Sequence, residues 1–157
     1  QLLEQNFGLL DYFKTLNRYF KIRKKAKKIF PQLSKAIVCS NRGIDFSPYL
    51  IEDLMDSLVG QEALKNCFYS VLMENAVKAT PLQAKGIYLQ EFQPWEIALV
   101  HYWKKTQRND LIGMPHSTHR YWDLRYFFAE KFFLKYTQDV FPDHIAVNGD
   151  YSMERCL

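Results

Sequence analysis

Short apolar runs alternate with longer stretches of helical periodicity along this chain. Four short runs end at polar or turn residues, which is typical of buried strands, and they lie at Ala36–Ser40, Gly86–Gln90, Leu111–Met114 and His144–Val147. Helix-length segments separate the last three runs. Strands and helices that alternate in this order favour a parallel sheet covered by helices. We therefore expect an α/β fold with a Rossmann-like open parallel sheet and flanking helices.

Start and stop signals mark the helices between these runs. Ser47 and Pro48 predict a helix start in which the serine hydroxyl is the cap and the proline takes the first helical position. Gly60 is expected to end that helix, and a second helix should follow and end at Pro81. Pro94 is expected to open the helix that joins the second and third runs.

Residues 2–30 form a separate pattern, because apolar side chains recur there on one helical face. We expect one long helix that Pro31 ends. The prediction for domain organisation is an amphipathic basic helix over residues 1–31 and a Rossmann-like domain over residues 32–157. Six cations lie within eight residues near the end of the helix: Lys21, Arg23, Lys24, Lys25, Lys27 and Lys28.

Two interpretations of this basic segment remain open. It is a solvated helix end whose cations complement the helix dipole, or it is a patch for an anionic membrane surface. The membrane interpretation places four residues at the lipid: Lys24, Lys25, Lys27 and Lys28. Nucleic acid is not expected as a partner, because no nucleic-acid-binding motif accompanies the cluster.

Composition narrows the class of protein. The 157 residues are 48% hydrophobic and 24% charged, which is ordinary for one globular domain. Aromatic residues reach 16%, and an aromatic helix is expected over residues 121–136. The three cysteines are widely spaced and show no metal-binding pattern, which favours a reduced cytoplasmic compartment. No run approaches the roughly 20 apolar residues of a membrane span.

Polar side chains follow two of the expected strands directly. Glu91 and His116 should emerge at the carboxyl edge of the sheet, where open α/β folds bind ligands. Glu91 is a candidate general base, and His116 can exchange a proton near neutral pH; either could instead brace a turn. Glu96 is a substrate-binding candidate, although a carboxylate in the first turn of a helix more often stabilises that helix end.

Further donors cluster after His116. Arg125 could bind a phosphate with two hydrogen bonds or pair with Asp123. The remaining substrate-binding candidates come from the turn itself: Ser117, Thr118, His119 and Arg120. We expect no metal site and no resident cofactor, because neither a metal-ligand cluster nor a Gly-rich phosphate loop is present.

Three segments carry a family resemblance: Gln-Glu-Phe-Gln-Pro-Trp-Glu at residues 90–96, Ile-Gly-Met-Pro-His-Ser-Thr at 112–118, and Tyr-Trp-Asp-Leu-Arg-Tyr-Phe at 121–127. They resemble bacterial surface carbohydrate (O-antigen type) biosynthesis proteins. That family is similar to glycosyltransferases of the GT-B architecture, which has two Rossmann-like domains. The resemblance is dense over residues 86–149, thinner over residues 36–80, and slight in the first 30 residues.

The resemblance implies a glycosyltransferase-like domain, the acceptor-side half of a GT-B enzyme. The acceptor would be a glycan or a lipid-linked glycan, and the nucleotide-sugar donor would bind mostly to a second domain. Transfer is then expected of the full-length protein and not of these residues alone. Two alternatives remain: a non-catalytic glycan-binding or scaffold domain of the same fold, and a small-molecule enzyme of another class.

Overall fold

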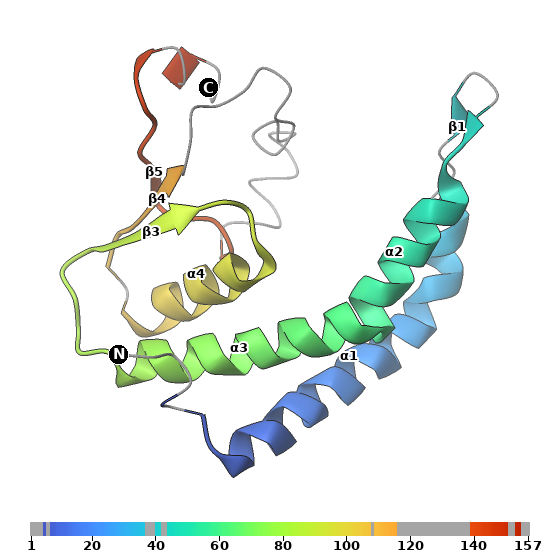
Figure 1. Cartoon of the computed structure of the whole chain (residues 1–157), viewed down its shortest axis with the longest axis horizontal. Coiled ribbons are helices and arrows are strands. Elements are labelled where there is room, and N and C mark those ends of the chain that lie inside the picture. Colours follow the sequence, from blue (N-terminus) through green and yellow to red (C-terminus); the bar gives the residue numbers. More distant parts are fainter. Residues whose placement is uncertain are drawn as a thin grey trace. The chain divides into compact units, whose positions relative to one another are not determined.

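The computed structural model describes residues 5, 7–36, 40–41, 44–107, 109–115, 139–150 and 153–154 (Figure 1). Within these residues the chain is α/β, with four helices, a two-stranded antiparallel sheet and a three-stranded parallel sheet. Its internal contacts divide the chain into two compact units, residues 2–72 and residues 73–157. The division after residue 31 that the sequence suggests stays a prediction.

The unit of residues 2–72 consists mainly of helices. It contains α1 (Leu9–Ala36), α2 (Ser47–Val59) and the first part of α3 (Gln61–Ala79). α1 lies alongside α2 and buries Thr15 and Ala26 (Figure 1). Polar contacts fix this packing, since the Tyr19 hydroxyl donates to the Val59 carbonyl at 2.6 Å. The Arg18 guanidinium donates to the Ser70 hydroxyl of α3 at 2.8 Å.

Two predictions at the end of the first helix are wrong. α1 continues through Pro31 to Ala36. Proline removes one helical hydrogen bond, and here it is exposed, so water can satisfy the carbonyl left without a donor. The run expected as a sheet strand begins at Ala36, which belongs to the helix, and ends at Ser40 in β1 (Ser40–Asn41). β1 pairs antiparallel with β2 (Ile44–Asp45), and residues 37–39 lie outside the described residues.

The start of α2 differs from the prediction in its cap. The helix begins at Ser47 itself, with Pro48 in its first turn. The Asp45 carboxylate accepts the Ser47 backbone N–H at 2.9 Å, so an aspartate takes the capping role that was predicted for the serine hydroxyl. The hydrogen bonds from Ser47 hold the pKa of Asp45 below its ordinary value.

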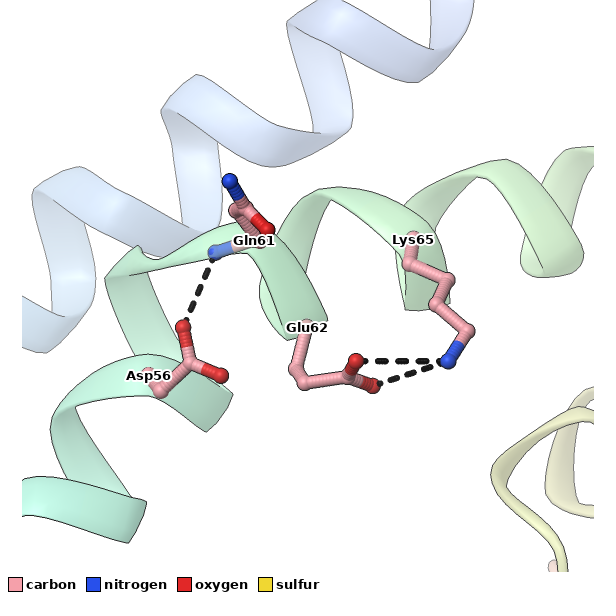
Figure 2. A network of polar contacts seen from close by, with 4 residues as sticks. All are labelled: Asp56, Gln61, Glu62 and Lys65. Atoms are coloured by element: carbon pink, nitrogen blue, oxygen red, sulfur yellow. Dashed lines mark hydrogen bonds and ion pairs between the residues drawn. The ribbon is translucent and has the colours of Figure 1, made fainter.

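A close approach at Gly60 joins α2 to α3. The Asp56 carboxylate near the end of α2 accepts the Gln61 backbone N–H at 3.0 Å and so caps α3 (Figure 2). A Cβ atom on Gly60 would lie 1.9 Å from that same carboxylate oxygen and 2.8 Å from the Asp56 Cα. Only glycine leaves room for this cap. One turn further, Glu62 pairs with Lys65 at 3.2 Å on the surface of α3 (Figure 2).

The unit of residues 73–157 contains the parallel sheet. Its order is β3 (Gly86–Gln90), β4 (Leu111–Pro115) and β5 (His144–Ile145), and α4 (Pro94–Thr106) joins the first two strands. The three strands expected in this region and the helix start at Pro94 are confirmed, although β5 ends two residues earlier than predicted. The α/β class with a parallel sheet is therefore confirmed, and the sheet has three strands within the described residues.

The core of this unit lies between the sheet and α4. Tyr88 and Leu111 of the sheet pack against Val100 and Trp103 of α4. Gly86 makes this packing possible, because a Cβ atom there would lie 2.5 Å from the Trp103 ring. The other side of α4 packs against the last part of α3 through three residues: Met73, Val77 and Tyr102. Sheet, α4 and α3 thus form successive layers of the unit.

Asp143 ties β5 to this core. Its carboxylate accepts the Leu111 backbone N–H at 2.9 Å and pairs with the Lys104 ammonium at 3.1 Å. Partial burial raises the pKa of Asp143, but the hydrogen bond from Leu111 and the charge of Lys104 together hold it below the ordinary value. The ionised form is therefore the one that the fold stabilises.

We predict that ionisation of Asp143 makes the stability of the chain depend on pH in the acidic range. Its folded pKa is lowered, so its contribution is present above the unfolded pKa of about 3.9 and is lost as pH falls through the folded pKa. Thermal unfolding of the parent chain and of Asp143→Asn should differ at neutral pH and converge in acid. A difference that stays constant down to strongly acidic pH would contradict this role.

We also predict that Gly60→Ala destabilises the chain by about 1–3 kcal/mol, because the new methyl group displaces the Asp56 cap. Gly8→Ala is the matched control, since its Cβ atom would meet nothing closer than an Asp11 oxygen at 4.0 Å. Urea unfolding of the two variants compares them directly. Equal losses would mean that the close approach at Gly60 is unimportant.

Candidate functional site

The carboxyl edge of β3 and β4 is the candidate site. The two strands are parallel and in register, with Gln90 opposite Pro115 at their carboxyl ends. The residues that follow these paired positions in the sequence are Glu91 and His116. The parallel pairing of the two strands is therefore confirmed. His116 lies outside the described residues, as do the other candidates of that segment: Ser117, Thr118, His119, Arg120 and Arg125.

Glu96 organises the turn between β3 and α4. Its carboxylate accepts the backbone N–H groups of Glu91 at 2.9 Å, Phe92 at 3.1 Å and Gln93 at 2.9 Å. The side chain is 4% exposed, and it lies in the first turn of α4, where the helix dipole favours negative charge. These contacts match the helix-end role that the sequence favoured, and a direct contact of Glu96 with substrate stays a prediction.

The turn that Glu96 holds has an unusual backbone. Phe92 has a φ of 61°, in the left-handed region that residues other than glycine rarely adopt. Such a conformation costs on the order of 1 kcal/mol or more and persists where surrounding contacts determine it. Here the three backbone hydrogen bonds to the Glu96 carboxylate hold Phe92 in this conformation. The position of Glu91, which is half-buried at the start of this turn, is thereby fixed relative to the sheet edge.

A second polar group lies at the same edge. The Gln90 side chain is 3% exposed, and its amide oxygen has no hydrogen-bond donor within the described part of the chain. The oxygen sits against Gly113, where a Cβ atom would lie only 2.6 Å away. A buried acceptor without a donor costs about 1–3 kcal/mol, and such groups often mark sites whose partner is a ligand or water.

Gln90 is not among the site residues predicted from the sequence, although a signal for it exists. Side chains alternate along β3, so that Gly86, Tyr88 and Gln90 face the core while Ile87 and Leu89 face outward. A glutamine in an inward position of a strand is a buried polar group, and the alternation could have identified it. The strand end was instead interpreted through Glu91 alone.

Two cavities lie away from this edge. One of about 610 Å³ lies at the opposite end of α4 and is lined by Glu74, Lys78, Leu82, Tyr102, Lys105, Thr106 and Gln107. The other, of about 280 Å³, lies within residues 2–72 and is lined by Arg18, Lys21, Ile22, Ser57, Ala63, Asn66, Cys67 and Ser70. Burial raises the pKa of the Cys67 thiol more than the charge of Arg18 lowers it, so this cysteine is a poor nucleophile at neutral pH.

Metal sites and membrane-spanning helices are two further classes of feature. No group of three or more histidine, cysteine, aspartate or glutamate side chains could hold a metal ion among the residues described. Over the same part of the chain, no helix has the length and apolar character needed to cross a bilayer. The strained turn after β3 and the buried Gln90 oxygen beside it make this edge the candidate ligand site.

We predict that Glu96→Gln lowers the unfolding free energy by about 2 kcal/mol, because the amide has one acceptor where the carboxylate has two and turns a donor toward a backbone N–H. Glu62→Gln is the control: Glu62 is also in the first turn of a helix, but it is paired only with exposed Lys65. The Glu62→Gln variant should lose no more than about 0.5 kcal/mol of unfolding free energy. Similar losses in urea unfolding would show that the turn does not need the carboxylate.

Comparison with known proteins adds no relative to this picture. The chain matches no protein-family model, and neither a curated protein nor a solved structure shows significant similarity to it.

Proposed function

We propose that this chain is a glycosyltransferase-like domain for bacterial surface polysaccharide and acts at the cytoplasmic side of the membrane. In this proposal the domain binds a glycan or lipid-linked acceptor at the carboxyl edge of β3 and β4. The nucleotide-sugar donor is bound mostly by a second Rossmann-like domain outside these residues. Support comes from the resemblance at residues 90–96, 112–118 and 121–127, the first of which forms the end of β3, the Glu96 turn and the start of α4.

The observation that carries the proposal is the fixed position of Glu91 at the sheet edge. Glu91 follows the last residue of β3, and its backbone N–H is held by the Glu96 carboxylate at 2.9 Å. A carboxylate placed at the carboxyl end of a parallel strand lies where ligands of open α/β sheets bind. Because three hydrogen bonds to Glu96 already hold the turn, binding an acceptor there would require little reorganisation of its backbone.

The chemistry proposed for this edge is proton transfer. As an acceptor hydroxyl oxygen attacks the anomeric carbon of the donor sugar, Glu91 takes the hydroxyl proton. The bond from the anomeric carbon to the nucleotide phosphate breaks, and the phosphate leaves with the bonding electrons. His116, next in sequence to β4, is the second candidate for acid–base work. The negative charge on the phosphate is offset by donors of the following segment: Ser117, Thr118, His119, Arg120 and Arg125.

We predict that Glu91→Gln lowers turnover of the full-length enzyme by roughly 100-fold or more, because the amide cannot accept the proton. Asp110→Asn is the matched control: Asp110 directly precedes β4 at the opposite edge of the same sheet and is exposed. Glycosyl transfer and thermal unfolding should be measured on both variants, with His116→Asn as a second test of the edge.

The three variants Glu91→Gln, His116→Asn and Asp110→Asn should keep the melting temperature of the parent protein. Near-normal transfer by Glu91→Gln and His116→Asn would reject the catalytic assignment. If these variants also bound acceptor normally, the non-catalytic glycan-binding interpretation would take its place. A loss of transfer in Asp110→Asn as large as in Glu91→Gln would remove the assignment of this edge.

A further inference from the structure

One side of α1 is exposed although it is strongly apolar. Thr15 and Ala26, which are 5% and 2% exposed, mark the packed side of the helix. The opposite side carries large apolar residues with high exposure, 81% for Leu9, 72% for Phe13 and 57% for Phe20. Contiguous exposed apolar surface of this kind marks an interaction site in most soluble proteins.

The same side of the helix becomes cationic further along the chain. Steps of three or four residues define the outward face of α1: Leu9, Phe13, Leu16, Phe20, Lys24 and Lys27. All six side chains are exposed, so the first half of this face is apolar and the second half is basic. Neither Lys24 nor Lys27 forms an ion pair within the described part of the chain.

Charge is distributed very unequally along the chain. α1 contains nine lysine and arginine residues and a single acidic residue, Asp11, which gives the helix a formal charge of +8. The whole chain carries +4, so all other residues together carry −4. A concentration of positive charge this high on one helix attracts anionic surfaces, and like charges three or four residues apart repel weakly until such a surface balances them.

We propose that the outward face of α1 binds an anionic lipid bilayer, with its apolar half inserted at the headgroup boundary and its basic half on the lipid phosphates. A helix with an apolar stripe and a strongly basic region lies in the plane of such an interface. A nucleic acid would account for the cations but would leave Leu9, Phe13 and Phe20 exposed to water. The bilayer accounts for both halves of the face.

The proposal predicts the size of each contribution. Each lysine near an anionic surface strengthens binding about five-fold. Neutralising Lys24 and Lys27 should therefore weaken binding on the order of 25-fold. Replacing Phe13 and Phe20 by serine should weaken it at least about 10-fold, since the rings no longer leave water on binding. Raised salt should weaken the lysine contribution, because exposed charges are screened over about 8 Å at physiological ionic strength.

The test is co-sedimentation of the 157-residue chain with vesicles of phosphatidylcholine and phosphatidylglycerol, compared with pure phosphatidylcholine. Lys24→Gln with Lys27→Gln is compared with Lys85→Gln plus Lys105→Gln, which removes two exposed cations from the other unit. Phe13→Ser with Phe20→Ser is compared with Leu82→Ser plus Ile97→Ser, whose parent side chains are 74% and 54% exposed. Thermal unfolding of each variant checks that the fold is intact.

Binding that requires phosphatidylglycerol and is weakened by both α1 variants, but by neither control, is the expected result. Three results would overturn the proposal. The lysine control could weaken binding as much as the α1 lysine variant. The phenylalanine variant could bind anionic vesicles normally. This would mean that the apolar half is not inserted and that α1 binds polyanions through charge alone. Pure phosphatidylcholine could bind as tightly as the anionic mixture.

This inference does not depend on glycosyl transfer. The outward face of α1 belongs to the unit of residues 2–72, and the sheet edge belongs to the unit of residues 73–157. A full-length protein that binds anionic vesicles but shows no glycosyl transfer would keep the lipid proposal and remove the enzymatic one. Glycosyl transfer that depends on Glu91, in a protein that does not bind vesicles, would keep the enzymatic proposal and remove the lipid proposal.

Discussion

The Glu96 carboxylate holds the turn on which both the sheet layer and the candidate site depend. Three consecutive backbone N–H groups, of residues 91–93, point at this one side chain. The turn reverses the chain between β3 and α4, so α4 can return along the sheet and bury Trp103 against Gly86. The same bonds keep Phe92 in its left-handed conformation and fix where Glu91 emerges. The Glu96 carboxylate therefore determines both the stability of the turn and the geometry of the edge.

The parallel sheet could be predicted from sequence because its strands are short apolar runs with clear ends. Gly86–Gln90 is bounded by a glycine and by polar residues, and Pro94 marks the helix that follows. The apolar runs, their ends and the helix start all agree with the fold in this region. Predictions from sequence succeed when such local signals agree with the fold. The carboxyl edge followed from the same pattern, since parallel strands bring their ends to one side of a sheet.

Other features could not be predicted in the same way because they depend on tertiary context. Pro31 lies inside α1, where exposure to water makes the lost hydrogen bond tolerable, and Ala36 joins that helix instead of a strand. A short apolar run can be a strand or a helix end, and pattern alone does not separate them. The buried acceptor of Gln90 and the three bonds to Glu96 become visible only when the turn is seen in three dimensions.

The two units present different surfaces, and the proposals follow that difference. Residues 2–72 contain a helix of formal charge +8 with an exposed apolar face, which suits an anionic bilayer. Residues 73–157 contain a sheet edge at which the Glu96 carboxylate holds the turn, and the proposed glycan acceptor would bind there. A protein that extends a lipid-linked glycan needs both kinds of surface, and this pairing connects the two proposals without making either depend on the other.

Backbone NMR can show whether the edge after β3 is the ligand site. An isotope-labelled chain would be titrated with a repeat-unit oligosaccharide released from a bacterial surface polysaccharide. We expect saturable shifts in the amide signals of Glu91, Phe92, Gln93 and Gly113, which surround the turn and the buried Gln90 oxygen. Saturable shifts confined to the cavity at the other end of α4, around Lys78 and Lys105, would contradict this expectation.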